Sequence, residues 1–188
     1  MKEIILSSIQ IKKICEEVGE KLNEKLKDET NIPVFVGVMN GGLNFMMDLI
    51  KEIKVPIMTD YIQISSWEGT SSTGIVNLKK DLTLDITNKT IVLVEDVVDS
   101  GYSLHYLKDF LNKKYRPKQI ILACLIDKQG ARKLDVEVNY AGLELKEDKF
   151  LMGYGLDYKE IARNVNCVYV PDKAEIDSYE KMLTKEGK

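Results

Sequence analysis

The feature that most constrains the fold of this chain is an alternation between short apolar runs and segments of helical periodicity. An apolar run of about four to eight residues is typical of a buried strand, and amphipathic spacing between two such runs is typical of a crossover helix. The alternation predicts an α/β fold, in which a largely parallel sheet carries helices on both faces. We expect strands at 33–38, 56–65, 90–95 and 119–127, an extended segment at 135–145, and helices at 8–28, 43–53 and 103–113.

Two segments illustrate how these assignments are made. Apolar residues recur at helical spacing from Ile11 to Leu26, and either Ser7 or Ser8 precedes them as a helix cap. The segment SWEGTSSTG, residues 66–74, is too polar and too rich in small residues to pack, so it predicts a loop.

Length and composition limit the classes of function. A chain of 188 residues can form one domain with a sizeable core, so we expect a single domain over 1–188 with a polar C-terminal tail at 171–188. A net charge of -3 gives no general reason to expect nucleic-acid binding. The chain has no apolar run of about 18 residues for a membrane span, and the N-terminal run is too short for a signal peptide. The three widely spaced cysteines favour a reduced, cytoplasmic setting.

The segment VLVEDVVDSGYSL, residues 92–104, combines two chemistries that one ligand has to satisfy. Its apolar run ends in Glu95, Asp96 and Asp99, whose carboxylates can accept hydrogen bonds from a sugar diol or hold hydrated Mg²⁺. Residues 100–103 then lead into a helix whose free N–H groups suit a phosphate. The GxxxxGK[ST] and GxGxxG patterns are absent, so the motif predicts a phosphorylated sugar as the ligand.

The same residues resemble the phosphoribosyl pyrophosphate (PRPP) motif of the type I phosphoribosyltransferases, in which two apolar residues precede Glu-Asp-x-x-Asp-[Ser/Thr]-Gly-x-[Ser/Thr]. Four further segments narrow the resemblance to the hypoxanthine(-guanine) phosphoribosyltransferases. They are similar, in order, to that family's pyrophosphate loop, mobile lid, base-recognition segment and metal-binding segment: 37–49, 65–76, 125–132 and 148–164. The resemblance covers roughly residues 1–170.

The resemblance implies a fold, a reaction and a set of partners. The fold would be the Rossmann-like type I phosphoribosyltransferase fold, with a small hood built from the N-terminal segment and roughly residues 135–170. The reaction would be purine salvage: N9 of hypoxanthine or guanine attacks C1′ of PRPP, and IMP or GMP and pyrophosphate result. The cofactor would be Mg²⁺. The protein would be a homodimer or homotetramer with small-molecule substrates, and it would bind neither nucleic acid nor membrane.

It also implies roles for individual residues. Asp99 would be the general base that takes the proton from purine N7. The ribose and 5′-phosphate of PRPP would be bound by Glu95, Asp96, Asp99, Ser100, Gly101, Tyr102 and Ser103. The pyrophosphate would be bound by Met39, Asn40, Gly41 and Arg163, and the metal by Glu95, Asp96 and Asp157. The purine would be bound by Lys128, Phe150, Leu151 and Asp157, beneath a lid that contains Ser66 and Trp67.

Two of these roles have a plain physical basis. The ammonium of Lys128 only donates hydrogen bonds, so it favours a 6-oxo purine over a 6-amino purine. Phe150 would stack on the base. A solvated lysine and a core phenylalanine are the alternatives for these two residues. Arg132 would support the pyrophosphate loop, with a surface salt bridge as its alternative.

The sequence departs from the family pattern at three places. Asn40 stands where the family often has Lys, next to an expected cis peptide bond between Met39 and Asn40. Trp67 stands in place of the family's Tyr in the lid, which removes a hydroxyl group. Ser100 and Ser103 replace Thr and retain the hydroxyls.

Two other functions remain open. One is a PRPP-sensing regulator that binds nucleic acid, but a basic stripe or added DNA-binding domain is not visible. The other is an enzyme of the same class that uses xanthine and guanine, since the sequence does not determine the contacts to the purine 2-position. The only histidine, His105, lies off the apolar face of its helix, so neither a histidine metal cluster nor a Ser-His-Asp triad can form.

Overall fold

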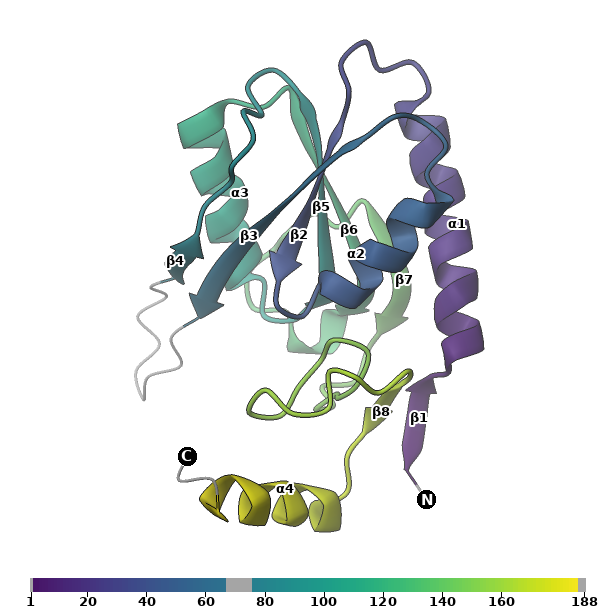
Figure 1. Cartoon of the computed structure of the whole chain (residues 1–188), viewed down its shortest axis with the longest axis vertical. Coiled ribbons are helices and arrows are strands. Elements are labelled where there is room, and N and C mark those ends of the chain that lie inside the picture. The colour runs from purple at the N-terminus through teal and green to yellow at the C-terminus, as the bar shows by residue number, and fades with distance from the viewer. Residues whose placement is uncertain (1, 67–75, 186–188) are drawn as a thin grey trace.

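The computed structural model describes residues 2–66 and 76–185. A central six-stranded sheet has the order β4-β3-β2-β5-β6-β7, and β1 pairs with β8 in a separate small sheet (Figure 1). The strands are β1 (Glu3–Leu6), β2 (Val34–Met39), β3 (Met58–Ser66), β4 (Val76–Lys80), β5 (Thr90–Val98), β6 (Gln119–Lys128), β7 (Tyr140–Leu145) and β8 (Val168–Val170). The helices are α1 (Ser8–Leu26), α2 (Leu43–Leu49), α3 (Tyr102–Tyr115) and α4 (Lys173–Lys185), with 3-10 turns η1 (Ile50–Glu52) and η2 (Gln129–Ala131).

The predicted parallel sheet is confirmed, with two differences. Strand β2 pairs in parallel with β3 and β5, and β6 pairs in parallel with β5 and β7. Strand β4, which the sequence does not predict, pairs antiparallel with β3 at the edge of the sheet. Residues 140–145, which the prediction included in the approximate range of the hood, form β7 and pair in parallel with β6.

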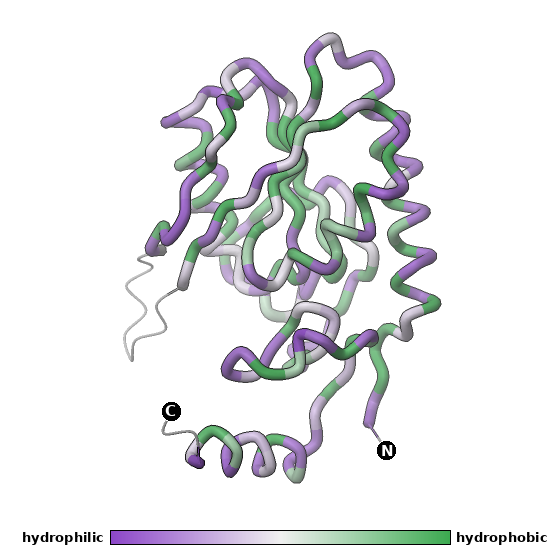
Figure 2. The backbone as a smooth tube through the Cα atoms, in the orientation of Figure 1, coloured by the Kyte–Doolittle hydropathy of each residue, from purple (hydrophilic) through white to green (hydrophobic). Residues whose placement is uncertain are grey.

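Two hydrophobic cores lie on opposite faces of the sheet because neighbouring residues of a strand point to opposite sides. On one face, Phe35 and Val92 pack with α1 and α2. On the other, Val36 and Leu93 pack with α3, whose Leu107 is fully buried. The strands form an apolar centre, and hydrophilic residues concentrate along the outer segments (Figure 2).

Helix α1 begins where its capping residues dictate. The backbone N–H of Gln10 donates to Ser7 Oγ at 3.3 Å, and the N–H of Ser7 donates to Gln10 Oε1 at 2.9 Å. This reciprocal capping box identifies Ser7, rather than Ser8, as the cap. The predicted apolar face from Ile11 to Leu26 is buried.

Beyond the carboxyl ends of the parallel strands lie the loop after β7, the small β1–β8 sheet and α4 (Figure 1). Residues 173–185 of the predicted polar tail form α4, whose Leu183 is buried. Among the described residues, no helix is both long and apolar enough to cross a membrane.

Candidate active site

Strand β5 carries two acids, Glu95 and Asp96, near its carboxyl end, and burial makes both hard to ionise. Asp96 is 7% exposed, and burial raises its pKa to about 6 even though the backbone N–H groups of Asp96 and Val97 hydrogen-bond to it. Burial and the nearby charge of Asp96 raise the pKa of Glu95, whose Oε2 is shielded from solvent without a partner among the described residues. Because an unpaired buried carboxylate oxygen is rare, this arrangement favours a cation or a hydroxyl-bearing ligand.

The loop after β5 presents N–H groups at the start of α3. Gly101 is the N-cap, with φ of 91°, and no side chain caps the helix. The N–H groups of Tyr102, Ser103 and Leu104 have no hydrogen-bond acceptor in the described part of the chain. A Cβ at position 101 would overlap the carbonyl oxygen of Leu134, so glycine is required for space as well as for φ. Free donors at a helix N-terminus form a suitable site for a phosphate.

The loop after β2 passes beside Asp96. The Met39–Asn40 peptide bond is cis, which confirms the expectation from the sequence. A Cβ at Gly41 would overlap the Asp96 carboxylate, and a Cβ at Gly155 would overlap the carbonyl oxygen of Gly41. Three segments that are distant in sequence therefore meet closely, and glycine makes two of the contacts possible.

Arg163 connects this meeting point to Asp157. Its Nη1 donates to the carbonyl oxygen of Gly155 at 2.6 Å, and its Nη2 lies 2.8 Å from both Asp157 Oδ1 and Glu160 Oε2. The charge of Arg163 lowers the pKa of Asp96, and the charge of Asp157 raises it. Both effects are smaller than the effect of burial. Arg163, Asp157 and Asp96 thus lie within electrostatic range of one another.

Lys128, at the end of β6, is buried among acids. Its side chain is 7% exposed, and its Nζ lies 3.4 Å from Asp99 Oδ2 and 2.9 Å from Asp148 Oδ1. The structure therefore places Lys128 beside the predicted base Asp99, 29 residues earlier in the chain. The solvated-lysine alternative is wrong, because this side chain is enclosed.

Phe150 and Leu151 have opposite environments. Phe150 is 54% exposed, and its ring packs against Tyr158 edge to face, with centroids 6.1 Å apart. Exposure rules out the core alternative for Phe150 and leaves part of its surface open to a planar ligand. Leu151 is buried in the core beneath α1 and α2, so its side chain is not available to a ligand.

Arg132 lies elsewhere than the resemblance implies. Its Nε donates to the carbonyl oxygen of Asp99 at 3.0 Å, its Nη1 donates to that of Val136 at 3.1 Å, and its Nη2 pairs with Asp127. It therefore supports the loop after β5, whereas the prediction assigned it to the loop after β2. Its side chain is mostly buried, at 17% exposure, so the surface alternative is wrong as well.

The predicted lid cannot be compared with the rest of the site. Trp67 lies outside the described residues, and Ser66 is described only as the last residue of β3. His105 is exposed on α3, as expected. Within the described ranges, no group of three or more His, Cys, Asp and Glu side chains could hold a metal ion.

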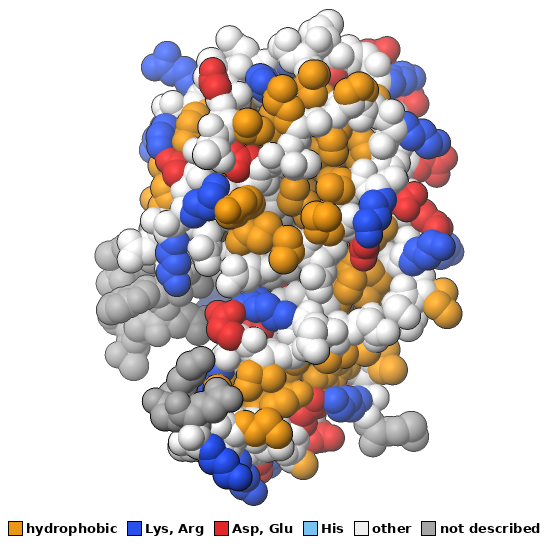
Figure 3. Space-filling model, viewed as in Figure 1, with side chains coloured by type: hydrophobic (Ala, Val, Ile, Leu, Met, Phe, Trp, Pro, Cys, Tyr) orange, Lys and Arg blue, Asp and Glu red, His pale blue; other side chains and the backbone are white. Residues whose placement is uncertain are grey.

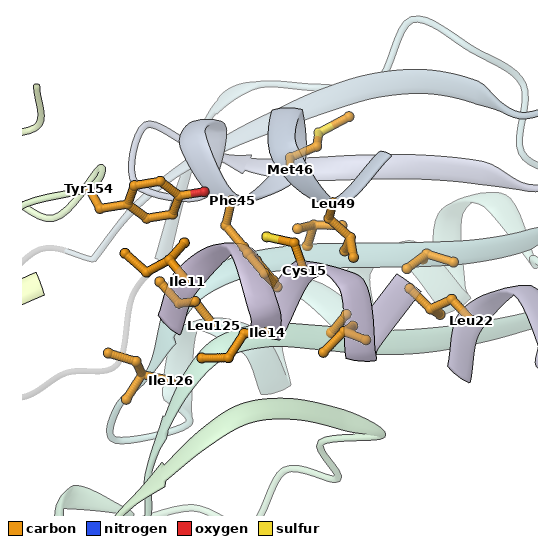
Figure 4. Close-up of a cluster of buried hydrophobic side chains, with 14 of the residues drawn as sticks. Ile11, Ile14, Cys15, Leu22, Phe45, Met46, Leu49, Leu125, Ile126 and Tyr154 are labelled. Carbon is orange, nitrogen blue, oxygen red and sulfur yellow. The ribbon is translucent and has the colours of Figure 1, made fainter. Parts of the chain in front are cut away.

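Two residues of the site are absent from the sequence prediction. Asp148 contacts Lys128, but an acid in a polar loop carries no distinctive signal. Tyr154 points toward α2 and the buried side chains around Phe45 (Figure 4), and its hydroxyl donates to Asp48 Oδ2 at 2.6 Å. Tyr154 anchors the loop that carries Asp157, a role that depends on contacts across more than a hundred residues.

Comparisons with known proteins agree with this geometry. The phosphoribosyl transferase domain family matches residues 2–159. A hypoxanthine-guanine phosphoribosyltransferase of Staphylococcus epidermidis is 38% identical over 166 residues, which cover 88% of this chain and 90% of the relative. A crystal structure of a hypoxanthine phosphoribosyltransferase from Staphylococcus aureus superposes with a TM-score of 0.86 at 34% identity and covers 93% of each chain.

A hypoxanthine-guanine phosphoribosyltransferase from Bacillus anthracis has a TM-score of 0.84 at 34% identity, with 92% of this chain and 99% of that chain covered. The relatives thus extend over about nine tenths of the chain. The chain belongs to the phosphoribosyltransferase family, within its hypoxanthine-guanine phosphoribosyltransferase branch.

Proposed function

We propose that this protein transfers the 5-phosphoribosyl group of PRPP to N9 of hypoxanthine and guanine, giving IMP or GMP and pyrophosphate. The observation that carries the proposal is the pairing of Lys128 with Asp99, at 3.4 Å. In hypoxanthine and guanine, N7 and O6 lie on one edge of the purine. A carboxylate that accepts the N7 proton and an ammonium that donates to O6 therefore have to be neighbours, as these two side chains are.

Base selection follows from the same pair. The ammonium of Lys128 can donate to a 6-oxo group but cannot accept from a 6-amino group, so adenine leaves it without a partner. Phe150 is half exposed, packs on Tyr158 and follows Asp148, the contact of Lys128, by two residues. We propose that it stacks on the base. The backbone at Leu151 and Asp157 is proposed to meet the pyrimidine edge of the purine.

PRPP is proposed to lie along the carboxyl ends of β2 and β5. Its 5′-phosphate binds the N–H groups at the start of α3 together with the hydroxyls of Ser100 and Ser103. Its ribose diol binds Glu95 and Asp96. Its pyrophosphate binds the backbone of 39–41 and Arg163, which stabilise the negative charge that develops as the group departs.

The acids at this edge fit a divalent cation, because a buried oxygen of Glu95 lacks a donor. Mg²⁺ is commonly bound by one or two carboxylates, with substrate oxygens and water completing the shell. The described acids do not converge into a complete metal site by themselves. Glu95, Asp96 and Asp157 would therefore hold the cation only together with oxygens of PRPP, where it would neutralise charge on the pyrophosphate. Asp157 is already paired with Arg163, so its oxygens are oriented before any ligand binds.

The surroundings of the site support two further proposals. The β1–β8 sheet and the loop at 146–167 are proposed to form a hood over the carboxyl ends of the strands. The protein is proposed to be a homodimer or homotetramer. Exposed Leu43 and Met47 of α2 support this, since apolar side chains gather on the face in Figure 3 that carries α2.

The test is a spectrophotometric assay of the purified protein with PRPP and Mg²⁺, offering hypoxanthine, guanine, xanthine and adenine separately. We expect turnover of hypoxanthine and guanine, loss of turnover on removal of Mg²⁺, and a fall of about 10²-fold or more in kcat for Asp99→Asn. Asp109→Asn, an exposed acid of α3 paired with Lys113, is the matched control and should retain full activity.

Other outcomes separate the alternatives. Turnover confined to xanthine and guanine would support the alternative base preference. PRPP binding without turnover of any base would refute the enzyme and favour a PRPP-sensing regulator.

A further inference from the structure

The contacts of Lys128 point to a residue whose role the reaction scheme does not include. The Lys128 ammonium has three donors, and burial makes an unpaired ammonium costly. Asp148 Oδ1 lies 2.9 Å from Nζ, closer than Asp99 Oδ2 at 3.4 Å. Among the described residues these two acids are its only ion-pair partners.

The backbone holds Asp148 in this position independently of the ion pair. Lys128 pairs with Leu145 at the end of the β6–β7 ladder, three residues before Asp148. A Cβ at Gly130 would overlap the carbonyl oxygen of Lys146 and lie 3.4 Å from the backbone nitrogen of Asp148. The turn after β6 and the segment after β7 are thus packed backbone to backbone, which only glycine permits at this contact.

We propose that Asp148 is a positioning residue for base recognition. It draws the Lys128 ammonium away from Asp99, so that one N–H faces O6 of the purine while Asp99 remains free to accept the N7 proton. This inference rests on the proposed function of Lys128 and Asp99. Without Asp148, the Lys128 ammonium has Asp99 as its one remaining acid partner among the described residues. It then moves toward Asp99 and pairs with the carboxylate that has to act as the base.

A purely structural role does not account for Asp148. Its side chain is 68% exposed, and exposed ion pairs add little to stability. Of the two groups in this ion pair, Lys128 is the enclosed one, since its side chain is 7% exposed. The effect of Asp148 should therefore appear in binding and turnover of the base rather than in folding.

The test compares Asp148→Asn with Glu147→Gln. Glu147 is the adjacent acid, is similarly exposed at 62%, and pairs with Lys149 instead of Lys128. For Asp148→Asn we expect KM for hypoxanthine and Kd for IMP to rise roughly tenfold, because a misplaced charged donor loses much of its hydrogen bond. KM for PRPP and the melting temperature should not change, and Glu147→Gln should match the wild type.

A double-mutant cycle gives the decisive readout. In a Lys128→Gln background, Asp148→Asn should have almost no further effect on KM for hypoxanthine, because its action passes through the ammonium. Asp148→Glu should recover most of the affinity. Additive effects, or an equal rise in KM for PRPP, would overturn the positioning role.

The proposed function can fail separately. Wild-type protein that turns over no purine would refute the proposed function itself. An active wild type together with Asp148→Asn that behaves like Glu147→Gln would refute only the role of Asp148.

Discussion

At the scale of single residues, the acids at the end of β5 oppose the stability of the free protein. An acid whose pKa is raised by folding binds its proton more tightly in the folded state, so its ionisation destabilises that state. For Asp96 the raised pKa of about 6 compares with 3.8 for an unperturbed aspartate. The ionisation of Asp96 therefore does not change the free energy of unfolding below pH 3.8. Its destabilising effect grows as the pH rises and reaches its full size above about pH 6.

This predicts that Asp96→Asn stabilises the ligand-free protein near neutral pH while weakening PRPP binding. The gain should approach about 3 kcal/mol at most, since one pKa unit corresponds to about 1.4 kcal/mol. Urea unfolding of both proteins in EDTA, from pH 4 to pH 8, measures it. The gain should vanish near pH 4; a gain independent of pH would show that ionisation is not its cause.

At the scale of elements, α4 supports the loop that carries the proposed purine site. Tyr179 of α4 packs on the cluster of Met152, Ala162 and Tyr169. The hydroxyls of Tyr169 and Tyr179 both donate to Glu175 Oε1, at 2.8 and 2.9 Å. The helix thus braces the segment between Phe150 and Arg163 from the side opposite the core.

Removing this brace should affect both stability and base binding. We expect Tyr179→Ala to destabilise the protein by about 1 to 3 kcal/mol, since it removes a half-buried ring and a hydrogen bond. KM for hypoxanthine should rise more than KM for PRPP, because the brace contacts the loop after Phe150. Denaturant unfolding and steady-state kinetics measure these effects. Lys181→Ala, an exposed position on the same helix, is the control, and equal effects in both variants would exclude the brace.

At the scale of the whole molecule, the site joins segments that the chain keeps far apart. The loops after β2, β5 and β6 and the loop at 153–163 converge at one edge of the sheet. A ligand that touches all of them binds only the folded state, so it should stabilise the protein against unfolding.

PRPP together with Mg²⁺ is therefore expected to raise the melting temperature. At a hundredfold excess over Kd the stabilisation is about 2.7 kcal/mol, or roughly 5 to 10 °C for a chain of this size. Either component alone should produce a much smaller shift. Differential scanning fluorimetry measures it. An equal shift with PRPP in EDTA would contradict the proposed role of the cation.

The sequence by itself determined the parts of this protein that depend on neighbouring residues. Apolar runs and helical spacing located strands β2, β3, β5 and β6 and helices α1, α2 and α3 to within a few residues, because side-chain periodicity follows from local geometry. The PRPP motif was legible for the same reason, since a strand end, an acidic pair and a helix start lie within a dozen residues. The sequence narrowed the cap of α1 to Ser7 or Ser8, and the capping box with Gln10 decides for Ser7.

Only the tertiary structure decided which distant residues meet. Sheet order and register bring Lys128 beside Asp99, and the packing at Gly130 brings Asp148 to the same ammonium. Arg132 supports the loop after β5 because the turn after β6 packs against that loop. The residues next to Arg132 in the sequence do not indicate this contact. Strand β4 and helix α4 are stabilised mainly by partners elsewhere in the chain. Their own sequences are too polar to indicate a strand or a helix, so neither element was predicted.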